Sequence, residues 1–446
     1  MFDVSTAIIL IVSLVGLVVI GVHIAIALGM TSALGIWLVT GQDWNAFNTV
    51  KVMLAAKAYE GIRDYVFAVI PLFMLMGEFI GKSGAITDVY RGINYMLSKL
   101  PGRLAIATVF GNALFSFVTG VSIASAAAFS RIAYPEMKRH GYHKGFALGT
   151  VAGSSCLGML IPPSVLMIVW GILTENSIGK IFLAGVLPGL LLTTLFCTYV
   201  LGMALFKPEI VGSGSESRVE AAEIVPKKQF YTSLAGIVIV VVAVLGGILF
   251  GVFSPTEGAG VGALLGLILG VIKGMRYKEI IDSILSVGRT SGPILLLLVT
   301  AALYSNTLAM TGLANAIESL FLESGMPSWA IIGVMVLIWF LLGMIIDSIS
   351  IMLLTAAIFA PIAVKLGYDP IAFAIIGIIA IEAGLLTPPF GLLVYTVKSA
   401  ITSIDPDVNV MTIFKSATPY WIIMLIGMVL IITFPEIATY LPRVLF

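Results

Sequence analysis

The chain has 446 residues, of which 59% are hydrophobic and only 11% are charged, and its formal net charge is +1. Soluble domains carry about 25% charged residues, so this composition, with a mean hydropathy of +1.11, excludes a soluble globular protein and indicates an integral membrane protein. The near-neutral charge, without clusters of basic and aromatic residues, gives no sign of nucleic-acid binding.

Apolar segments recur along the whole chain, and most are long enough to be helices in a membrane. A helix needs about 20 residues to cross the bilayer core, so we predict an all-α polytopic membrane protein. In the first half, amphipathic helices on the membrane surface are expected at 44–63 and 87–100. Embedded segments are expected within 4–40, with breaks near Gly21 and at Gly29–Thr31, and at 65–81, 103–118, 123–138, 145–174 and 181–206.

An internal repeat links the two halves of the chain. When the sequence is shifted by 226 positions, a set of first-half residues meets identical residues in the second half without a gap. The matching pairs are Ser122 and Ser348, Pro135 and Pro361, Gly141 and Gly367, Tyr142 and Tyr368, Gly158 and Gly384, Leu160 and Leu386, Pro162 and Pro388, Pro163 and Pro389, and Leu166 and Leu392.

The second half is predicted to repeat the element order of the first. Amphipathic segments are expected at 273–289 and 406–416. Embedded segments are expected at 231–253, 257–272, 291–311, 329–364 (a hairpin), a span broken at Thr387-Pro388-Pro389 that ends near 403, and 418–440.

Each repeat is predicted to contain a re-entrant helical hairpin and a proline-broken helix. The first hairpin turns at Gly120-Val121-Ser122, and the second turns at Asp347-Ser348-Ile349-Ser350. Pro162 and Pro163 cannot donate backbone hydrogen bonds, so they break the span over 145–174. The carbonyls that such a break frees survive in a bilayer only when they are buried in protein or face a polar cavity.

The flanking basic residues predict that the two repeats have inverted topology. Arg103 and the 138–144 segment flank the first hairpin, whereas Lys365 is almost the only base beside the second, so the hairpins enter from opposite sides. Inverted repeats with broken helices are typical of secondary transporters. The predicted domains are a first repeat at 1–206 (scaffold 1–100, hairpin and broken helix 103–174, closing helix 181–206), a cytoplasmic linker at 207–229, and a second repeat at 230–446 (scaffold 230–311, hairpin and broken helix 329–403, closing helix 418–440).

The hairpin tips and the breaks predict two sites for a coupling cation. Freed carbonyls and hydroxyls are hard oxygen donors, which suit Na⁺ better than a soft metal. The first predicted site comprises Thr119, Gly120, Ser122, Ser125, Gly158 and Pro162, and the second comprises Asp347, Ser348, Ser350, Gly384, Thr387 and Pro388. The alternative is that the serines only bond back to their own helices and the prolines only bend them.

Other polar residues at membrane depth are candidates for the solute. Ser154, Ser155 and Ser164 beside the first break are predicted to contact the substrate. Glu382 is assigned to the same site, although a proton-carrying or inter-helix structural role remains open. Glu78 and Glu257 are expected to be buried hydrogen-bond partners that hold helices together.

An intramembrane enzyme is the alternative from another functional class. Ser122 or Ser155 would be the nucleophile and His140 or His143 the base, but both histidines lie in a basic loop that disfavours an imidazolium. The sequence has no His-Glu-x-x-His motif, no Gly-x-Ser-x-Gly elbow and no P-loop. We therefore predict a transporter that does not use ATP.

Several motifs together resemble a known family. Those motifs are Ile70-Pro71-Leu72-Phe73-Met74-Leu75-Met76-Gly77, the serine-rich tip near Gly120, Leu160-Ile161-Pro162-Pro163-Ser164, Phe253-Ser254-Pro255-Thr256-Glu257 and Gly384-Leu385-Leu386-Thr387-Pro388-Pro389. They are similar to the large membrane subunit, the DctM-type permease, of tripartite ATP-independent periplasmic (TRAP) transporters. The resemblance covers essentially the whole chain.

The resemblance implies an elevator-type transporter of the ion transporter superfamily in the bacterial inner membrane. Such subunits import carboxylate-bearing solutes, such as C4-dicarboxylates, keto acids or sialic acids, and are driven by Na⁺. Their partners are a small four-helix membrane subunit, expected here as a separate chain, and a periplasmic substrate-binding protein. A stand-alone Na⁺- or H⁺-coupled anion symporter or antiporter of the same fold remains the alternative.

Overall fold

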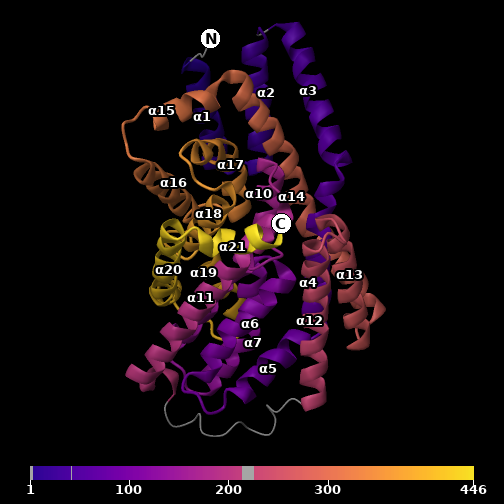
Figure 1. Ribbon diagram of the computed structural model, residues 1–446, viewed down its shortest axis with the longest axis vertical. Helices are drawn as coiled ribbons and strands as arrows, with labels where there is room; N and C mark the ends of the chain where they lie inside the picture. Colours follow the sequence, from indigo (N-terminus) through magenta and orange to yellow (C-terminus); the bar gives the residue numbers. More distant parts are fainter. Residues whose placement is uncertain (1–3, 42, 213–225) are drawn as a thin grey trace.

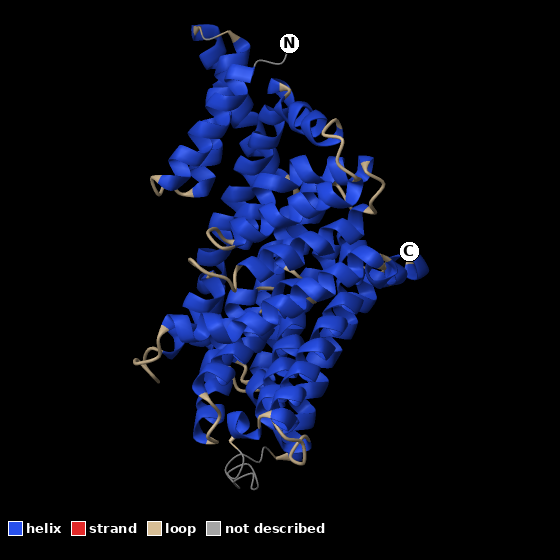
Figure 2. Ribbon diagram, turned by 90° about the vertical axis from the view of Figure 1, so that its left-hand side faces the viewer, coloured by secondary structure: helices blue, strands red, loops and turns tan. Residues whose placement is uncertain are grey.

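The described part of the chain, residues 4–41, 43–212 and 226–446 of a computed structural model, consists of helices joined by short loops and contains no β-strand (Figure 2). Within it, eight helical segments are long and apolar enough to cross a membrane. The chain is therefore an all-helical, multi-pass membrane protein, as its composition predicts. Of the predicted linker at 207–229, residues 213–225 lie outside the described part.

The first half follows the predicted order of elements. The predicted break near Gly21 is confirmed, whereas the second is wrong because one helix continues through Gly29–Thr31. The elements are α1 (Val4–Val19), α2 (Ile24–Thr40), α3 (Trp44–Arg63), the 3-10 turn η1 (Tyr65–Ala68), α4 (Val69–Lys82), α5 (Ala85–Met96), the hairpin arms α6 (Arg103–Thr119) and α7 (Ser122–Arg139), the broken pieces α8 (Lys144–Ser155), α9 (Leu157–Leu160) and α10 (Val165–Thr174), then α11 (Ile178–Phe206) and η2 (Pro208–Val211).

The second half begins with long helices and ends with an amphipathic one. Its hairpin is α16 with α17, and its broken span is α18 with α19. The elements are α12 (Lys227–Leu249), α13 (Pro255–Ile272), α14 (Tyr277–Thr311), α15 (Leu313–Leu322), α16 (Ser328–Gly343), α17 (Ser348–Lys365), α18 (Pro370–Gly384), α19 (Leu392–Ile401), α20 (Val410–Thr433) and α21 (Glu436–Leu445).

Three features of the second half correct the predicted boundaries. The predicted amphipathic segment at 273–289 and span at 291–311 form one helix, α14, because Pro293 lies inside it without ending it. The predicted pieces at 406–416 and 418–440 are divided differently: α20 starts after its cap Asn409 and ends before Pro435, and α21 is separate. The short helix α15 was not predicted at all.

The helices of the two halves correspond at the same shift of 226 positions. Hairpin arms α6 and α7 match α16 and α17, and broken pieces α8 and α10 match α18 and α19. Their contacts are reciprocal, because α7 packs against α19 while α17 packs against α10. In Figure 1 the first hairpin lies in the lower half of the molecule and the second in the upper half. The sequence repeat thus corresponds to a repeated order of helices.

The first broken helix lies at the centre of the molecule. In the broken span Lys144–Thr174, 89% of the apolar stretch is buried, compared with 28% in α12. The side chains of Trp170 from the first repeat and Trp339 from the second meet there, with ring centroids 6.3 Å apart, and both pack against Phe373. Aromatic rings at such distances stabilise each other beyond their burial, so this cluster joins the two repeats.

An ionic cluster fastens the outer end of the first hairpin to the loop after α19. The buried carboxylate of Asp405 accepts a hydrogen bond from the Tyr134 hydroxyl at 2.8 Å and lies 2.9 Å from both Lys138 Nζ and Lys144 Nζ. Hydrogen bonds from Lys144, Lys138 and Tyr134 hold the pKa of this carboxyl well below its usual range. The cluster therefore links the hairpin, the broken helix and the loop.

Replacing Asp405 with asparagine should lower the stability of the chain by about 1 kcal/mol, because both lysines are partly exposed and solvent screens the pairs. A lowered folded-state pKa gives stability that is fully present above the unfolded pKa of about 4 and is lost only below it. The loss in thermal midpoint of detergent-solubilised protein should thus be equal at pH 5 and pH 8. Asp407→Asn, at an exposed position nearby, is the control, and a loss that appears only at pH 8 would contradict this account.

Candidate functional site

The tip of the first hairpin is pressed against the first break. Gly120 ends α6 in the left-handed conformation, with φ of 62°, and its carbonyl accepts a hydrogen bond from the Val165 N–H at 3.1 Å. A Cβ atom added at Gly120 would lie 2.3 Å from the carbonyl oxygen of Pro163, and one added at Gly158 would lie 2.8 Å from Ser122 Cα. Only glycine allows this approach of two backbones.

The first break is buried, and the carbonyl of Met159 beside it has a partner inside the protein. Pro162 and Pro163, joined by a cis peptide bond, separate α9 from α10 and are enclosed. Ser164 begins α10 as its cap, and its hydroxyl donates to the carbonyl of Met159 at 2.5 Å. The expectation that such a break is buried in protein or faces a polar cavity is met here, because the residues from 158 to 164 are all buried.

The tip of the second hairpin is built around a carboxylate. Asp347 begins α17 and accepts a hydrogen bond from the Ser350 N–H at 3.0 Å, while the Ser350 hydroxyl donates to its other oxygen. Thr387, at the second break, donates to the carbonyl of Gly384 at 2.6 Å. A Cβ atom at Gly384 would lie 2.4 Å from the carbonyl oxygen of Phe340 in α16, so hairpin and broken helix are again in close contact.

The two breaks differ in exposure. Pro388, like its repeat partner Pro162, is followed by a cis prolyl bond, but Pro388 and Pro389 are exposed. The backbone N–H of Phe390 donates to the carbonyl of Met344 at the second hairpin tip, at 3.2 Å. The second tip and break thus support each other at the surface of the chain, whereas the first pair is enclosed.

Both hairpin tips converge on one buried carboxylate, that of Glu382 in α18. Its side chain is fully buried, and Oε1 accepts a hydrogen bond from the Ser348 hydroxyl at 2.7 Å. The hydroxyl of Ser122, the repeat partner of Ser348, lies close to the same carboxylate without meeting the geometry of a hydrogen bond. The repeat position of Glu382 is Cys156, whose thiol lies 3.6 Å from the Glu382 carbonyl. Glu382 therefore stands where the two repeats meet.

Several oxygen atoms at this meeting point lack partners. The hydroxyls of Ser122 and Ser125 and Oε2 of Glu382 are fully buried and make no hydrogen bond with any residue that the structure describes. An unsatisfied buried polar group costs about 1–3 kcal/mol, and native proteins leave few of them. Hydroxyl and carboxylate oxygens are ligands suited to a hard cation, so this donor set fits Na⁺.

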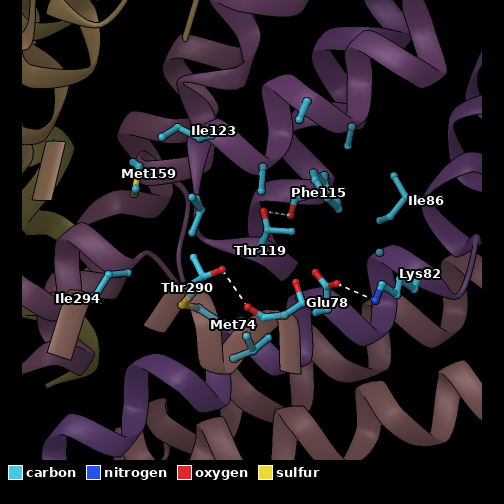
Figure 3. A pocket seen from close by; sticks show the side chains of 18 of the residues that line it. Met74, Glu78, Lys82, Ile86, Phe115, Thr119, Ile123, Met159, Thr290 and Ile294 are labelled. Atoms are coloured by element: carbon cyan, nitrogen blue, oxygen red, sulfur yellow. Dashed lines mark hydrogen bonds and ion pairs between the residues drawn. The ribbon is translucent and has the colours of Figure 1, made fainter. Parts of the chain in front are cut away.

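A cavity of about 570 Å³ lies beside the tips, between the first hairpin and helices α4 and α14 (Figure 3). Thr119 of the first tip lines it, as do Asp347 and Ser348 of the second, together with Thr290 of α14. Figure 3 also shows Glu78 and Lys82 of α4 as an ion pair, with 3.1 Å between Nζ and Oε1. Small-molecule sites occupy about 300–1,000 Å³, so a small organic solute fits this cavity.

The three serines predicted to contact the solute do not line this cavity. Ser154 donates to Thr150 and accepts from Asn112 Nδ2 at 2.7 Å, and Ser155 donates to Ala152. Ser154, Ser155 and Ser164 are all fully buried. Their hydroxyls thus have partners within the protein, and their assignment to the solute stays a prediction.

The two other acidic candidates behave differently from each other. Glu78 is partly buried and lines the cavity, but its pair with Lys82 lies within helix α4, so it does not hold two helices together as expected. The expectation that Glu257 is a buried partner between helices is wrong, because it is exposed and forms a capping box with Ser254 at the start of α13. His23, inside the first apolar stretch, caps α2.

Sequence reasoning missed two cationic residues of the cavity, Lys82 and Arg131. Arg131 lies within the α7 arm at 123–138, which was treated as apolar throughout. An ionisable residue within such an arm is itself a signal of a functional site, so the sequence did contain the information.

Comparison with known proteins places the chain in a family. The model of the family described as "Tripartite ATP-independent periplasmic transporter, DctM component" matches residues 11–437. The chain belongs to this DctM component family. The resemblance stated from the motifs is confirmed, and because the family consists of transporters, the enzyme alternative is excluded.

The DctM relatives named for a solute differ in what that solute is. The chain is 32% identical to the C4-dicarboxylate TRAP transporter large permease protein DctM of Pseudomonas aeruginosa, over 94% of each protein. It is 26% identical to the sialic acid TRAP transporter large permease protein SiaM of Vibrio cholerae, over 87% of this chain and 89% of that protein.

A solved transporter has a similar fold. The structure of the YdaH transporter of Alcanivorax borkumensis aligns with a TM-score of 0.65 at 14% identity, over 90% of this chain and 89% of that one. At this identity the match concerns the fold alone. It agrees with the all-helical transporter architecture of the DctM chain.

Proposed function

We propose that this DctM family member is the large transmembrane subunit of a Na⁺-coupled importer for a carboxylate-bearing solute. The observation that carries the proposal is the convergence of both hairpin tips on Glu382 beside a cavity of about 570 Å³. The relatives named for C4-dicarboxylate and sialic acid support an acid as the solute. The particular acid is left to experiment.

The proposed mechanism is an elevator movement between two inverted-topology repeats. The reciprocal packing of α7 with α19 and of α17 with α10 supports a mobile body made of hairpins and broken helices. Helices of 1–100 and 230–311 would form the scaffold, and the cavity lies between this scaffold and the first hairpin. A solute bound there would cross the membrane as the mobile body slides along α4 and α14.

The proposed coupling sites are the two predicted donor sets. Thr119, Gly120, Ser122, Ser125, Gly158 and Pro162 form the first, and Asp347, Ser348, Ser350, Gly384, Thr387 and Pro388 form the second. Orphaned hydroxyls at Ser122 and Ser125 support the first site. A carboxylate repels an anionic solute, so we assign Glu382 to the cation, between both sites, in place of its predicted contact with the solute.

The proposed partners follow from the relatives, which are named as large permeases of tripartite transporters. They are a small four-helix membrane subunit on a separate chain and a periplasmic substrate-binding protein. The bacterial inner membrane would be the location. The predicted cytoplasmic linker at 207–229 would connect the repeats.

A stand-alone Na⁺- or H⁺-coupled symporter or antiporter is the second candidate, because a buried carboxylate such as that of Glu382 can carry protons in place of binding Na⁺. The test is uptake of labelled succinate, pyruvate and N-acetylneuraminate into proteoliposomes that contain the chain and its small partner. Uptake that requires both the binding protein and an inward Na⁺ gradient is expected. Uptake of free solute, or uptake driven by protons alone, would favour the second candidate.

Asp347→Asn is expected to raise the Na⁺ concentration for half-maximal uptake by about tenfold, since loss of a charged contact weakens binding by about 1.5 kcal/mol or more. Asparagine can still cap α17, so the amount of folded protein should change little. Asp369→Asn, at the cap of α18, is the matched control. Equal Na⁺ affinity in Asp347→Asn and the unaltered chain would show that Asp347 is not part of the coupling site.

A further inference from the structure

The cavity beside the hairpin tips contains one cation that no carboxylate neutralises. Among the described residues that line it, four are charged: Glu78, Lys82, Arg131 and Asp347. Lys82 is paired with Glu78, and Asp347 accepts two hydrogen bonds from Ser350. Arg131 has no such partner within the ion-pair distance of 4.0 Å in the part of the chain that the structure describes.

The helix that carries Arg131 leaves space in front of it. Ala124, Ala127 and Ala128 line the same cavity and lie seven, four and three positions before Arg131 on α7. Residues at these spacings share one face of a helix, and side chains on a helix point toward its N-terminus. The Cα–Cβ bond of Arg131 is therefore tilted toward the hairpin tip, along a row of alanines, and the side chain lines the cavity that a small solute would enter.

We propose that Arg131 is the anchor for the solute's carboxylate group, an inference that rests on the proposed function. Arginine holds a carboxylate with two parallel N–H···O hydrogen bonds, which gives both charge and orientation. Arg131 is itself exposed and the neighbouring residues of its helix that line the cavity are alanines, so its guanidinium is open to an approaching carboxylate. The alternative is an arginine that merely extends its charge toward water along apolar surface.

The charge balance of the cavity connects this anchor to the coupling ion. The two basic and two acidic side chains cancel, so a bound carboxylate leaves the cavity with an excess negative charge. A cation at Asp347 in the second tip removes that excess. Binding of the solute at Arg131 and of Na⁺ at Asp347 should therefore favour each other, and each ligand should raise the affinity for the other by the same factor.

The test compares Arg131→Gln and Arg131→Lys with the control Arg91→Gln, which alters an exposed arginine of α5 outside the cavity. Proteoliposomes with the small partner and the binding protein take up whichever of succinate, pyruvate and N-acetylneuraminate the unaltered chain transports. At saturating Na⁺, Arg131→Gln should raise the KM for the solute at least tenfold. The KM of Arg131→Lys should lie between those of the unaltered chain and Arg131→Gln, because an ammonium keeps the charge and loses the two-point contact.

A second readout separates binding from folding. Purified chain in detergent is heated with and without each acid at millimolar concentration: the unaltered chain and Arg91→Gln should be stabilised by the transported acid, and Arg131→Gln should not. The midpoint without solute should be unchanged in Arg131→Gln, since its guanidinium makes no ion pair.

The outcomes distinguish the two proposals. Normal uptake with an unchanged KM and unchanged stabilisation in Arg131→Gln would overturn the anchor and leave the proposed function standing. Failure of the unaltered chain to take up or bind any of the three acids would overturn the proposed function, and the anchor with it.

Discussion

Replacing Gly120 with alanine is expected to abolish transport and to lower the thermal unfolding midpoint of the chain by several degrees. The left-handed conformation at this residue costs an alanine about 1–2 kcal/mol. In addition, the new Cβ would lie 2.3 Å from the carbonyl oxygen of Pro163, which is backbone and has little freedom to move. The hairpin tip would have to withdraw from the break, and the hydrogen bond between Gly120 and Val165 would be lost.

Gly333→Ala is the matched control, because a Cβ atom at this exposed position of α16 would meet nothing within 4 Å. Alanine in a helix interior is favoured over glycine by up to about 1 kcal/mol, so this variant should be as stable as the original or slightly more so. Uptake and thermal midpoint of both variants are measured side by side. Normal uptake by Gly120→Ala would show that the close contact of tip and break is not needed.

Replacing Glu382 with alanine and with glutamine is expected to distinguish a structural role of this residue from an electrostatic one. Alanine at this position leaves the Ser348 hydroxyl without its acceptor in a fully buried place, which should cost about 1–3 kcal/mol in stability. Glutamine keeps an acceptor and a similar shape but removes the negative charge. Glu382→Gln should therefore fold almost normally while requiring a roughly tenfold higher Na⁺ concentration for uptake.

The measurement is uptake as a function of Na⁺ for both variants, with thermal unfolding in detergent for each. Glu60→Gln, at an exposed position of α3, provides the control for loss of a negative charge. If Glu382→Gln loses uptake at an unchanged Na⁺ dependence, the residue carries protons or contacts the solute, and its assignment to the coupling cation is wrong.

The order of helices could be predicted because hydropathy and prolines act locally, and because the repeat at 226 positions gives each hairpin and break a second, independent indication. Hairpin turns at Gly120 and Asp347 and breaks at the paired prolines were placed within a few residues of where they lie. The predicted helix boundaries are wrong where an amphipathic segment is directly followed by an apolar one, as in α14, which continues through Pro293. The missed helix α15 is the repeat partner of α5, so applying the shift to every segment would have found it.

The site was harder to predict because its members come from distant parts of the chain. The sequence indicates that Ser122 and Ser348 are equivalent, but it does not indicate that both lie near Glu382. Glu382 has no counterpart in the first repeat, because Cys156 occupies the matching position. Helix rotation also decides which polar groups face the cavity. The sequence therefore does not indicate that Arg131 lines the cavity. For the same reason it predicts that Ser154 and Ser155 contact the solute, although their hydroxyls donate hydrogen bonds within the protein.

The central claim, that the first hairpin tip binds the coupling cation, is tested most directly by the stability of purified Ser122→Ala/Ser125→Ala protein with and without Na⁺. Both hydroxyls are buried without a hydrogen bond to the described part of the chain, so in Na⁺-free choline buffer the variant should be at least as stable as the unaltered chain. At a Na⁺ concentration about 100 times the dissociation constant, the unaltered chain should gain about 2.7 kcal/mol and the variant much less. Equal stabilisation of both proteins by Na⁺ would contradict the account.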